Sequence, residues 1–178
     1  MAEMHENYED ILDFWLTPGM EDVWYANDPK FDAGIRDRFM LTYEAAKDGK
    51  LDAWRSQARS LLALIIVLDQ FPRNMFRGEA RAFATDHLAC SLSKEGISKD
   101  FDRGLGGAGL DFFYMPLLHS ETLADHHLLI QRGRGDERYT REHRAIIERF
   151  GRHPHRNAAL GRTNTPEEAR FLAGGNTD

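Results

Sequence analysis

The sequence contains one cysteine, Cys90, in 178 residues. A single thiol excludes an internal disulfide and the cysteine-rich zinc patterns, and it gives no indication of an oxidising compartment. Long apolar runs are also missing, because the longest, residues 61–68, is far too short to cross a bilayer. The first fifteen residues hold five acidic residues and no Lys or Arg, which is not typical of a secretory signal. We therefore expect a cytoplasmic protein without a membrane partner.

β-Strand patterns are nearly absent as well, whereas apolar residues recur at helical spacing from end to end. The chain length suits one compact domain with a sizeable core. The sequence therefore predicts an all-α protein, a single domain over residues 1–178, built of seven to nine helices stacked as antiparallel hairpins. The expected helices cover residues 8–16, 29–48, 51–71, 79–94, 120–132 and 137–150, and a last one begins near 165.

The helix expected at residues 51–71 is apolar on all sides after Ser60, which predicts the central buried helix of the fold. Two helix ends are expected from residues that interrupt helices. Gly96 is expected to end the fourth helix, and Pro116 is expected to end the aromatic run at residues 112–115. The four glycines within residues 104–109 indicate a loop.

Two helix starts carry capping patterns. Ser120 can cap the helix that follows it, with Glu121 at its positive end. The second start is clearer, because Thr165 offers an N-cap hydroxyl, Pro166 stands at the first helical position and Glu168 completes a capping box.

Charge is unevenly spread along the chain, whose formal net charge is −6. Residues 1–60 hold thirteen Asp and Glu against seven Lys and Arg, whereas residues 130–162 hold nine Arg and no Lys against four acids. The acidic half disfavours a nucleic-acid coat, although the arginine-rich segment alone could contact RNA or DNA. Arginine suits carboxylate or phosphate partners, which are either internal acids or an external ligand.

The segment 150–162 is the strongest indication of a functional site. It is a turn between two helices, punctuated by glycine and proline, and a turn that only reverses the chain has no need of imidazole and guanidinium groups at this density. Anion binding, proton transfer and metal ligation all remain open for such a set. Its polar side chains are Arg152, His153, His155, Arg156, Asn157 and Arg162.

A second polar group follows the most apolar helix. Asp69 lies where that helix is expected to end, and a carboxylate there is costly unless it is paired. Arg73, four residues on, is the nearest candidate. We interpret Asp69 as half of a structural clamp in preference to a catalytic acid, and we assign Arg73 and Asn74 to ligand binding.

Three further side chains complete the candidate set. His119 and Glu121 precede a helix whose His126 and His127 lack the spacing of a helical zinc site, so no metal is assigned and histidines that cap or pair are the simpler interpretation. His143 shares a face with Ile146, Ile147 and Phe150, where a histidine is more often part of the core. That face leads into the 150–162 turn, so His143 and His155 can converge on a proton-transfer site.

Taken together, four separated motifs resemble one family. They are Leu12-Asp13-Phe14-Trp15, then Leu68-Asp69-Gln70-Phe71-Pro72-Arg73-Asn74, then Tyr114-Met115-Pro116 with His119-Ser120-Glu121, and the 150–162 turn. In this order they resemble the bacterial domain of unknown function 924. The resemblance implies a tetratricopeptide-like helical fold and no activity. His153 stands where the family pattern has an aromatic residue, and Leu110 where a Glu-Arg pair commonly precedes the aromatic run.

Two functional hypotheses follow. In the first, the protein binds a small anionic molecule bearing phosphate or carboxylate: Arg73, Asn74, Arg156, Asn157 and Arg162 hold it, while His119, Glu121, His143 and His155 supply acid-base or hydrolytic chemistry. In the second, it is a tetratricopeptide-like module that binds a protein partner, and the polar cluster serves structure only. The sequence does not decide between enzyme and binding protein, and it names no cofactor.

Overall fold

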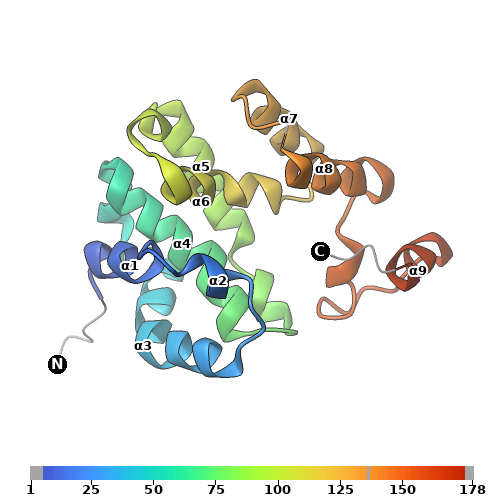
Figure 1. The fold of residues 1–178 in the computed structure, drawn as a ribbon, viewed down its shortest axis with the longest axis horizontal. Coiled ribbons are helices and arrows are strands. Elements are labelled where there is room, and N and C mark those ends of the chain that lie inside the picture. The colour runs from blue at the N-terminus through green and yellow to red at the C-terminus, as the bar shows by residue number, and fades with distance from the viewer. Residues whose placement is uncertain (1–5, 136, 175–178) are drawn as a thin grey trace. The chain divides into compact units, whose positions relative to one another are not determined.

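The computed structural model describes residues 6–135 and 137–174, and these residues form helices and connecting segments without a strand (Figure 1). The all-α class is therefore confirmed. The α-helices are α1 (Tyr8–Trp15), α2 (Glu21–Trp24), α3 (Pro29–Lys47), α4 (Ala58–Met75), α5 (Asp86–Ser98), α6 (Gly107–Leu118), α7 (Leu123–Gln131), α8 (Arg138–Phe150) and α9 (Pro166–Ala173). Short 3-10 helices are η1 (Asp52–Ser56), η2 (Ala80–Phe83), η3 (Phe101–Gly104) and η4 (Pro154–Arg156).

The chain divides into two compact units. The N-terminal unit comprises residues 1–77 and 81–116, and the C-terminal unit comprises residues 78–80 and 117–178. In the N-terminal unit α3 packs on α4 and α4 on α5, and in the C-terminal unit α7 packs on α8, which is compatible with tetratricopeptide-like stacking. The extent of a single domain over the whole chain stays a prediction.

Helix α4 is the centre of the N-terminal unit. It packs against α1, α3 and α5, and every side chain except Arg73 from Ser60 to Phe76 is buried. Aromatic rings surround it, and Phe71 lies 4.7 Å from Phe39 and 5.4 Å from Trp15 between ring centroids. The prediction of a central buried helix is confirmed, because burying apolar surface on all sides is the main gain available to such a segment.

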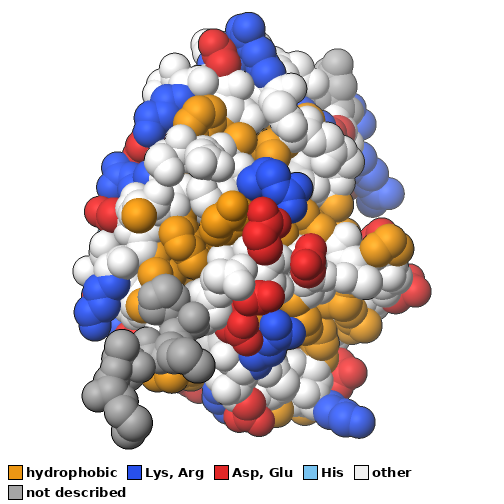
Figure 2. Space-filling model, turned by 90° about the vertical axis from the view of Figure 1, so that its left-hand side faces the viewer, with side chains coloured by type: hydrophobic (Ala, Val, Ile, Leu, Met, Phe, Trp, Pro, Cys, Tyr) orange, Lys and Arg blue, Asp and Glu red, His pale blue; other side chains and the backbone are white. Residues whose placement is uncertain are grey.

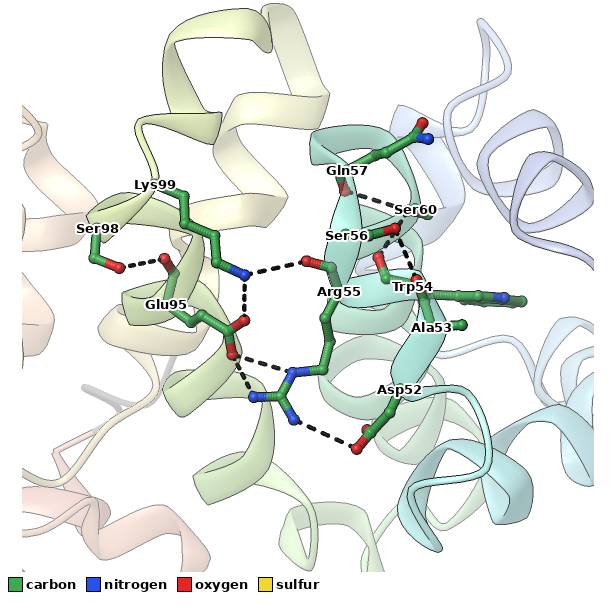
Figure 3. A network of polar contacts seen from close by, with 10 residues as sticks. All are labelled: Asp52, Ala53, Trp54, Arg55, Ser56, Gln57, Ser60, Glu95, Ser98 and Lys99. Carbon is green, nitrogen blue, oxygen red and sulfur yellow. Dashed lines mark hydrogen bonds and ion pairs between the residues drawn. The ribbon is translucent and has the colours of Figure 1, made fainter.

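The start of this helix was predicted too early. Residues 52–56 form η1, and Gln57 is extended at φ −139° and ψ 153°, so α4 begins at Ala58. Figure 3 shows what holds η1 in place: Arg55 donates to Glu95 on α5 at 3.1 and 2.5 Å, and Lys99 donates to the same carboxylate at 2.6 Å. Pairings with a helix forty residues away therefore fix a segment that local periodicity assigns to α4.

Pro72 and Pro116 lie inside helices, whereas the sequence predicts one helix end just before Pro72 and another at Pro116. Helix α4 continues past Pro72 to Met75, and α6 continues past Pro116 to Leu118. A proline inside a helix removes the N–H that would bond the carbonyl four residues earlier. For Pro72 that carbonyl belongs to Leu68, and it accepts a hydrogen bond of 2.6 Å from the buried hydroxyl of Thr85 instead. The side chain thus replaces the lost backbone donor.

Gly96 also lies inside its helix, because α5 runs to Ser98. A Cβ atom on Gly96 would approach Phe113 at 2.5 Å and Leu61 at 2.7 Å. Both distances are too short for real contacts, so this glycine allows α5 to lie closely against its neighbours. The residue interpreted as a helix end is a packing position.

Replacing Gly96 by alanine is expected to lower the free energy of unfolding by about 1 to 2 kcal/mol, because the new methyl group must displace packed side chains. Gly34, on the exposed face of α3, is the matched control. Nothing lies within 4 Å of a Cβ there, so Gly34→Ala should raise stability by about 0.5 to 1 kcal/mol through helix propensity. Urea denaturation of the two variants measures both values, and equal changes would contradict the packing role of Gly96.

Three other expected boundaries change. The helix expected at 79–94 is divided into η2 and α5, the helix expected from Ser120 begins at Leu123, and α6 begins at Gly107, inside the segment interpreted as a loop. The predicted start at Thr165 is confirmed, because its side chain and that of Glu168 form both bonds of a capping box.

Surface charge on the face seen in Figure 2 is mixed. Lys and Arg side chains are interspersed with Asp and Glu, and hydrophobic side chains lie between them. Across the described ranges, none of the helices has the length and apolar character needed to span a membrane.

Candidate functional site

The candidate site lies in the C-terminal unit, in the turn that follows α8. The helix ends at Phe150 and is capped by Gly151, whose N–H bonds the Ile147 carbonyl at 2.8 Å and whose left-handed backbone (φ +68°) turns the chain out of the helix. The chain then runs through extended His153 into η4. This path buries His153, Arg156 and Asn157 and leaves His155 exposed.

Histidine rings gather around this turn. The ring of His153 lies 5.5 Å from that of His143 on α8 and 5.3 Å from that of His155, between centroids. The charges of Arg156 and His119 also act on His153. We call His119, His143, His153, His155 and Arg156 the histidine cluster. The structure therefore brings together four of the side chains that the sequence predicted as site residues.

His153 is the most unusual member of the cluster. Its side chain is 0% exposed, and neither ring nitrogen has a hydrogen-bond partner among the described residues. Burial lowers the pKa of the ring far below its usual range, and the charges of Arg156, His155, His143 and His119 lower it further. The imidazole is therefore neutral, with one N–H donor and one lone pair that the surrounding protein does not satisfy.

Glu121 and Arg162 form an ion pair beside the histidine cluster, which we call the Glu121–Arg162 clamp. The guanidinium of Arg162 donates to both carboxylate oxygens, at 2.8 and 3.0 Å, and also to the His153 carbonyl at 3.0 Å. The backbone N–H of His153 donates to Glu121 at 2.8 Å. Burial raises the pKa of Glu121, but the bonds from Arg162 and His153 outweigh it and hold the pKa below its usual value. An ionised carboxylate in this pair holds the turn, and its acid-base role stays a prediction.

The other side of the turn is fastened to α9. Arg152 donates to both carboxylate oxygens of Glu168 at 2.6 and 2.8 Å, which lowers the pKa of Glu168 to about 2. Asn157 donates through its amide to Asn164 at 2.8 Å. These contacts order the backbone that carries His153 and Arg156, and the predicted ligand-binding roles of Asn157 and Arg162 remain untested.

Two histidines of α7 and α8 have defined tautomers. His126 is 0% exposed, and its Nε2 lies 2.9 Å from the Ser120 carbonyl. His143 places Nδ1 3.1 Å from the Tyr139 carbonyl. A carbonyl only accepts, so each of these nitrogens carries the hydrogen. The Nδ1 of His126 then holds a lone pair, buried and without a partner among the described residues, and burial lowers the pKa of this ring.

Sequence reasoning missed two of these side chains. His126 was interpreted as a capping or pairing histidine without the spacing of a zinc site, whereas its position three residues after Leu123 and three before Leu129 indicates a buried helix face. His153 was not among the assigned site residues, although its position directly before Pro154 in the densest His and Arg segment was a signal for it.

The remaining predicted residues belong to the N-terminal unit, at the end of α4. Arg73 contacts Asp69 at 3.2 Å, as the clamp prediction requires, and it also pairs with Asp86 through two bonds of 3.0 Å. Asn74 donates to Asp32 at 2.8 Å. These side chains are therefore engaged with carboxylates of their own unit, and their ligand-binding role stays a prediction.

The described parts of the chain contain no group of three or more His, Cys, Asp or Glu side chains placed to hold a metal ion. Cys90 is buried in α5. Among the chemistries open to the turn, the arrangement is best suited to hydrogen bonding and proton transfer by imidazole beside a buried guanidinium.

These features define an all-α protein whose C-terminal unit gathers histidines around a buried turn. Residues 11–176 match the model of the family described as bacterial protein of unknown function (DUF924), and the chain belongs to that family. It is similar to the solved structure of a protein of unknown function from Agrobacterium tumefaciens, with 42% identity over 94% of this chain and 97% of the other and a TM-score of 0.88. No curated protein matches the sequence.

Proposed function

We propose that the C-terminal unit binds a small anionic molecule at the histidine cluster, with imidazole groups placed for acid-base chemistry. The observation that carries the proposal is the fully buried ring of His153, whose two nitrogens have no partner in the described structure. Buried polar groups are nearly always hydrogen-bonded, and an exception calls for an explanation such as a bound ion, a water molecule or a catalytic role.

The electrostatics of the cluster favour an anion. Arg156 is 6% exposed, and its charge lowers the pKa of both His153 and Glu121. A group that lowers the pKa of two neighbours creates positive potential at both positions, and positive potential favours a negative ligand. The exposed His155, 5.3 Å from His153, connects the buried ring to the surface.

Acid-base capacity comes from His143 and His155. The Nδ1–H of His143 donates to a backbone carbonyl, which fixes the orientation of the ring. An oriented imidazole is the usual general acid or base in proteins. No reaction is assigned, because the same groups also serve a protein that only binds.

The second hypothesis, a tetratricopeptide-like module with a purely structural polar cluster, is supported by the pairing of Glu121 with Arg162 and of Arg152 with Glu168. For these four side chains a scaffolding role accounts for every contact described above. It does not account for the unpartnered nitrogens of His153, and this difference favours the anion site.

Replacing Arg156 by glutamine is expected to weaken anion binding at least tenfold, because the guanidinium supplies the positive potential. A thermal-shift panel of phosphorylated and carboxylated metabolites measures this effect. A ligand present at about 100 times its dissociation constant stabilises the native state by about 2.7 kcal/mol, which shifts the melting temperature clearly.

The exposed Arg170 on α9 provides the matched control, since Arg170→Gln changes the net charge equally without touching the cluster. His155→Gln is the second test variant, because its exposed position makes a folding defect easy to avoid. If no compound stabilises the wild type, or if Arg156→Gln and His155→Gln respond as the control does, the anion site does not exist.

A further inference from the structure

The ring of His153 lies where a proton is costly. It is 0% exposed, and no acceptor among the described residues bonds either of its nitrogens. A protonated imidazole carries two N–H donors and a positive charge, and burying it without acceptors or a counter-charge costs far more than burying the neutral ring. The folded turn is therefore suited to the neutral form of His153 alone.

The charges that face this ring repel a proton. They act from its own turn, from α8 and from the segment before α7, and they belong to Arg156, His155, His143 and His119. Arg156 is itself 6% exposed, and the three histidines become positive when they are protonated. The carboxylate of Glu121 is nearby, but it bonds the backbone N–H of His153 and the guanidinium of Arg162. It offers the ring no hydrogen bond.

The two carboxylates that fasten the turn keep their charge in mildly acidic solution. Burial raises the pKa of Glu121, but the bonds from Arg162 and His153 hold it below its reference value of 4.5. On the side of α9, the bonds from Arg152 lower the pKa of Glu168 to about 2. Histidine is the side chain whose charge changes between pH 5 and 7, so a response of this turn in that range comes from its imidazoles.

We propose that His153 is a pH-sensitive switch: the 150–162 turn stays closed while the ring is neutral, and mildly acidic solution opens it, because the ring takes up a proton only after it leaves the interior. The inference concerns the ligand-free protein and does not depend on the proposed anion site. Opening breaks the backbone bonds within the turn, from the Arg156 N–H to the His153 carbonyl at 3.1 Å and from the Arg162 N–H to the Asn157 carbonyl at 2.8 Å.

Proton linkage gives the direction and the size of the effect. In the opened turn the ring titrates at its ordinary value of 6.5, whereas in the closed turn burial, followed by the charge of Arg156, holds the pKa far lower. Protons therefore bind the open form. The closed form is fully favoured above pH 6.5 and is lost progressively as the pH falls below this value. The ratio of open to closed turns should rise about 25-fold between pH 7 and pH 5.

Amide hydrogen exchange of the full-length protein, followed by NMR at several pH values and corrected for the intrinsic exchange rates, measures this opening. The buffers contain no phosphate, sulfate or carboxylate, so that no bound anion stabilises the closed turn. The N–H groups of Arg156 and Arg162 should lose about 25-fold of their protection between pH 7 and pH 5. At pH 5 they should be about tenfold or more less protected than the N–H groups of Ile65 and Ile66 in the middle of α4.

The variant His153→Phe keeps an aromatic ring and removes the titrating group. The loss of protection at Arg156 and Arg162 over the same pH range should be about fivefold or more smaller than in the wild type. The exposed His127 on α7 provides the control, and His127→Phe should behave as the wild type does. Nitrogen-15 shifts of the wild-type rings give a readout independent of any variant, since the His153 ring of the closed protein should still be neutral at about pH 5.5.

Four results would each overturn the switch. The first is constant protection of the turn from pH 7 to pH 5, and the second is a loss in His153→Phe as large as in the wild type. The third is equal protection of the turn and of α4 at every pH, because the turn then opens only when the whole chain unfolds. The fourth is a protonated His153 ring inside a turn that stays protected. None of them bears on anion binding, which the thermal-shift panel tests separately.

Discussion

Replacing Glu121 by alanine is expected to lower the free energy of unfolding by about 2 to 4 kcal/mol. The substitution removes two bonds from Arg162 and one from the His153 N–H, and it leaves a guanidinium with a buried, unpartnered Nε beside the turn. Removing one partner of a mostly buried ion pair costs more than the pair itself contributes, because the remaining charge has lost its compensation.

The matched control is Glu142→Ala, which removes the partner of Arg138 on the exposed face of α8. Exposed ion pairs contribute about 0.5 kcal/mol or less, so this control should be nearly neutral. Urea denaturation followed by circular dichroism measures both variants. Equal losses for the two glutamates would contradict the clamp.

The same clamp has a pH dependence. The pKa of Glu121 in the folded protein lies below its reference value of 4.5, so its contribution to stability is complete above that pH and is lost as the pH falls through the folded value. Glu121→Gln removes this titration. Its acid unfolding curve should therefore be flatter than that of the wild type below about pH 4.5.

The position of the tryptophans makes the Glu121 experiment more informative. All three, Trp15, Trp24 and Trp54, belong to the N-terminal unit, whereas circular dichroism reports helices of both units. If the chain is one cooperative domain, fluorescence and circular dichroism of Glu121→Ala shift together. If the units unfold separately, fluorescence stays at the wild-type midpoint. This comparison tests the single domain predicted from the sequence.

The features of the fold that could be predicted from the sequence are those determined by residues close together in the chain. The capping box at Thr165 and the buried helix after Ser60 were found because their causes lie within a few residues. The errors have non-local causes. Helix α4 continues through Pro72 because Thr85, thirteen residues on, supplies a hydrogen-bond donor. Gly96 lies inside α5 because a Cβ atom at this position would collide with Phe113 and Leu61.

The candidate site also combines features with local causes and features with non-local causes. The density of His and Arg in residues 150–162 could be recognised from the sequence, since composition is local information. The pairing of Glu121 with Arg162 spans 41 residues, and the burial of His126 depends on packing between α7 and α8. The contacts that Glu121 makes with Arg162 and the His153 N–H could therefore not be predicted, its catalytic role stays a prediction, and His126 was not selected at all.

Replacing His153 by phenylalanine is expected to raise the free energy of unfolding of the ligand-free protein by about 1 to 2 kcal/mol. A buried donor or acceptor without a partner costs about 1 to 3 kcal/mol, and His153 has one of each. Phenylalanine removes both and keeps an aromatic ring against His143, 5.5 Å away between centroids. Its slightly larger ring takes back part of the gain through tighter packing.

Denaturation must be measured in a buffer free of phosphate, sulfate and carboxylates, so that no anion stabilises the wild type through its histidine. The exposed His127 on α7 is the control, and His127→Phe should change stability by less than about 0.5 kcal/mol. A clear loss of stability in His153→Phe would show that the ring nitrogens are satisfied in the folded protein. A gain, together with weaker anion binding, would mean that this chain keeps a destabilising imidazole in its interior for the sake of binding, as is common where function and stability compete.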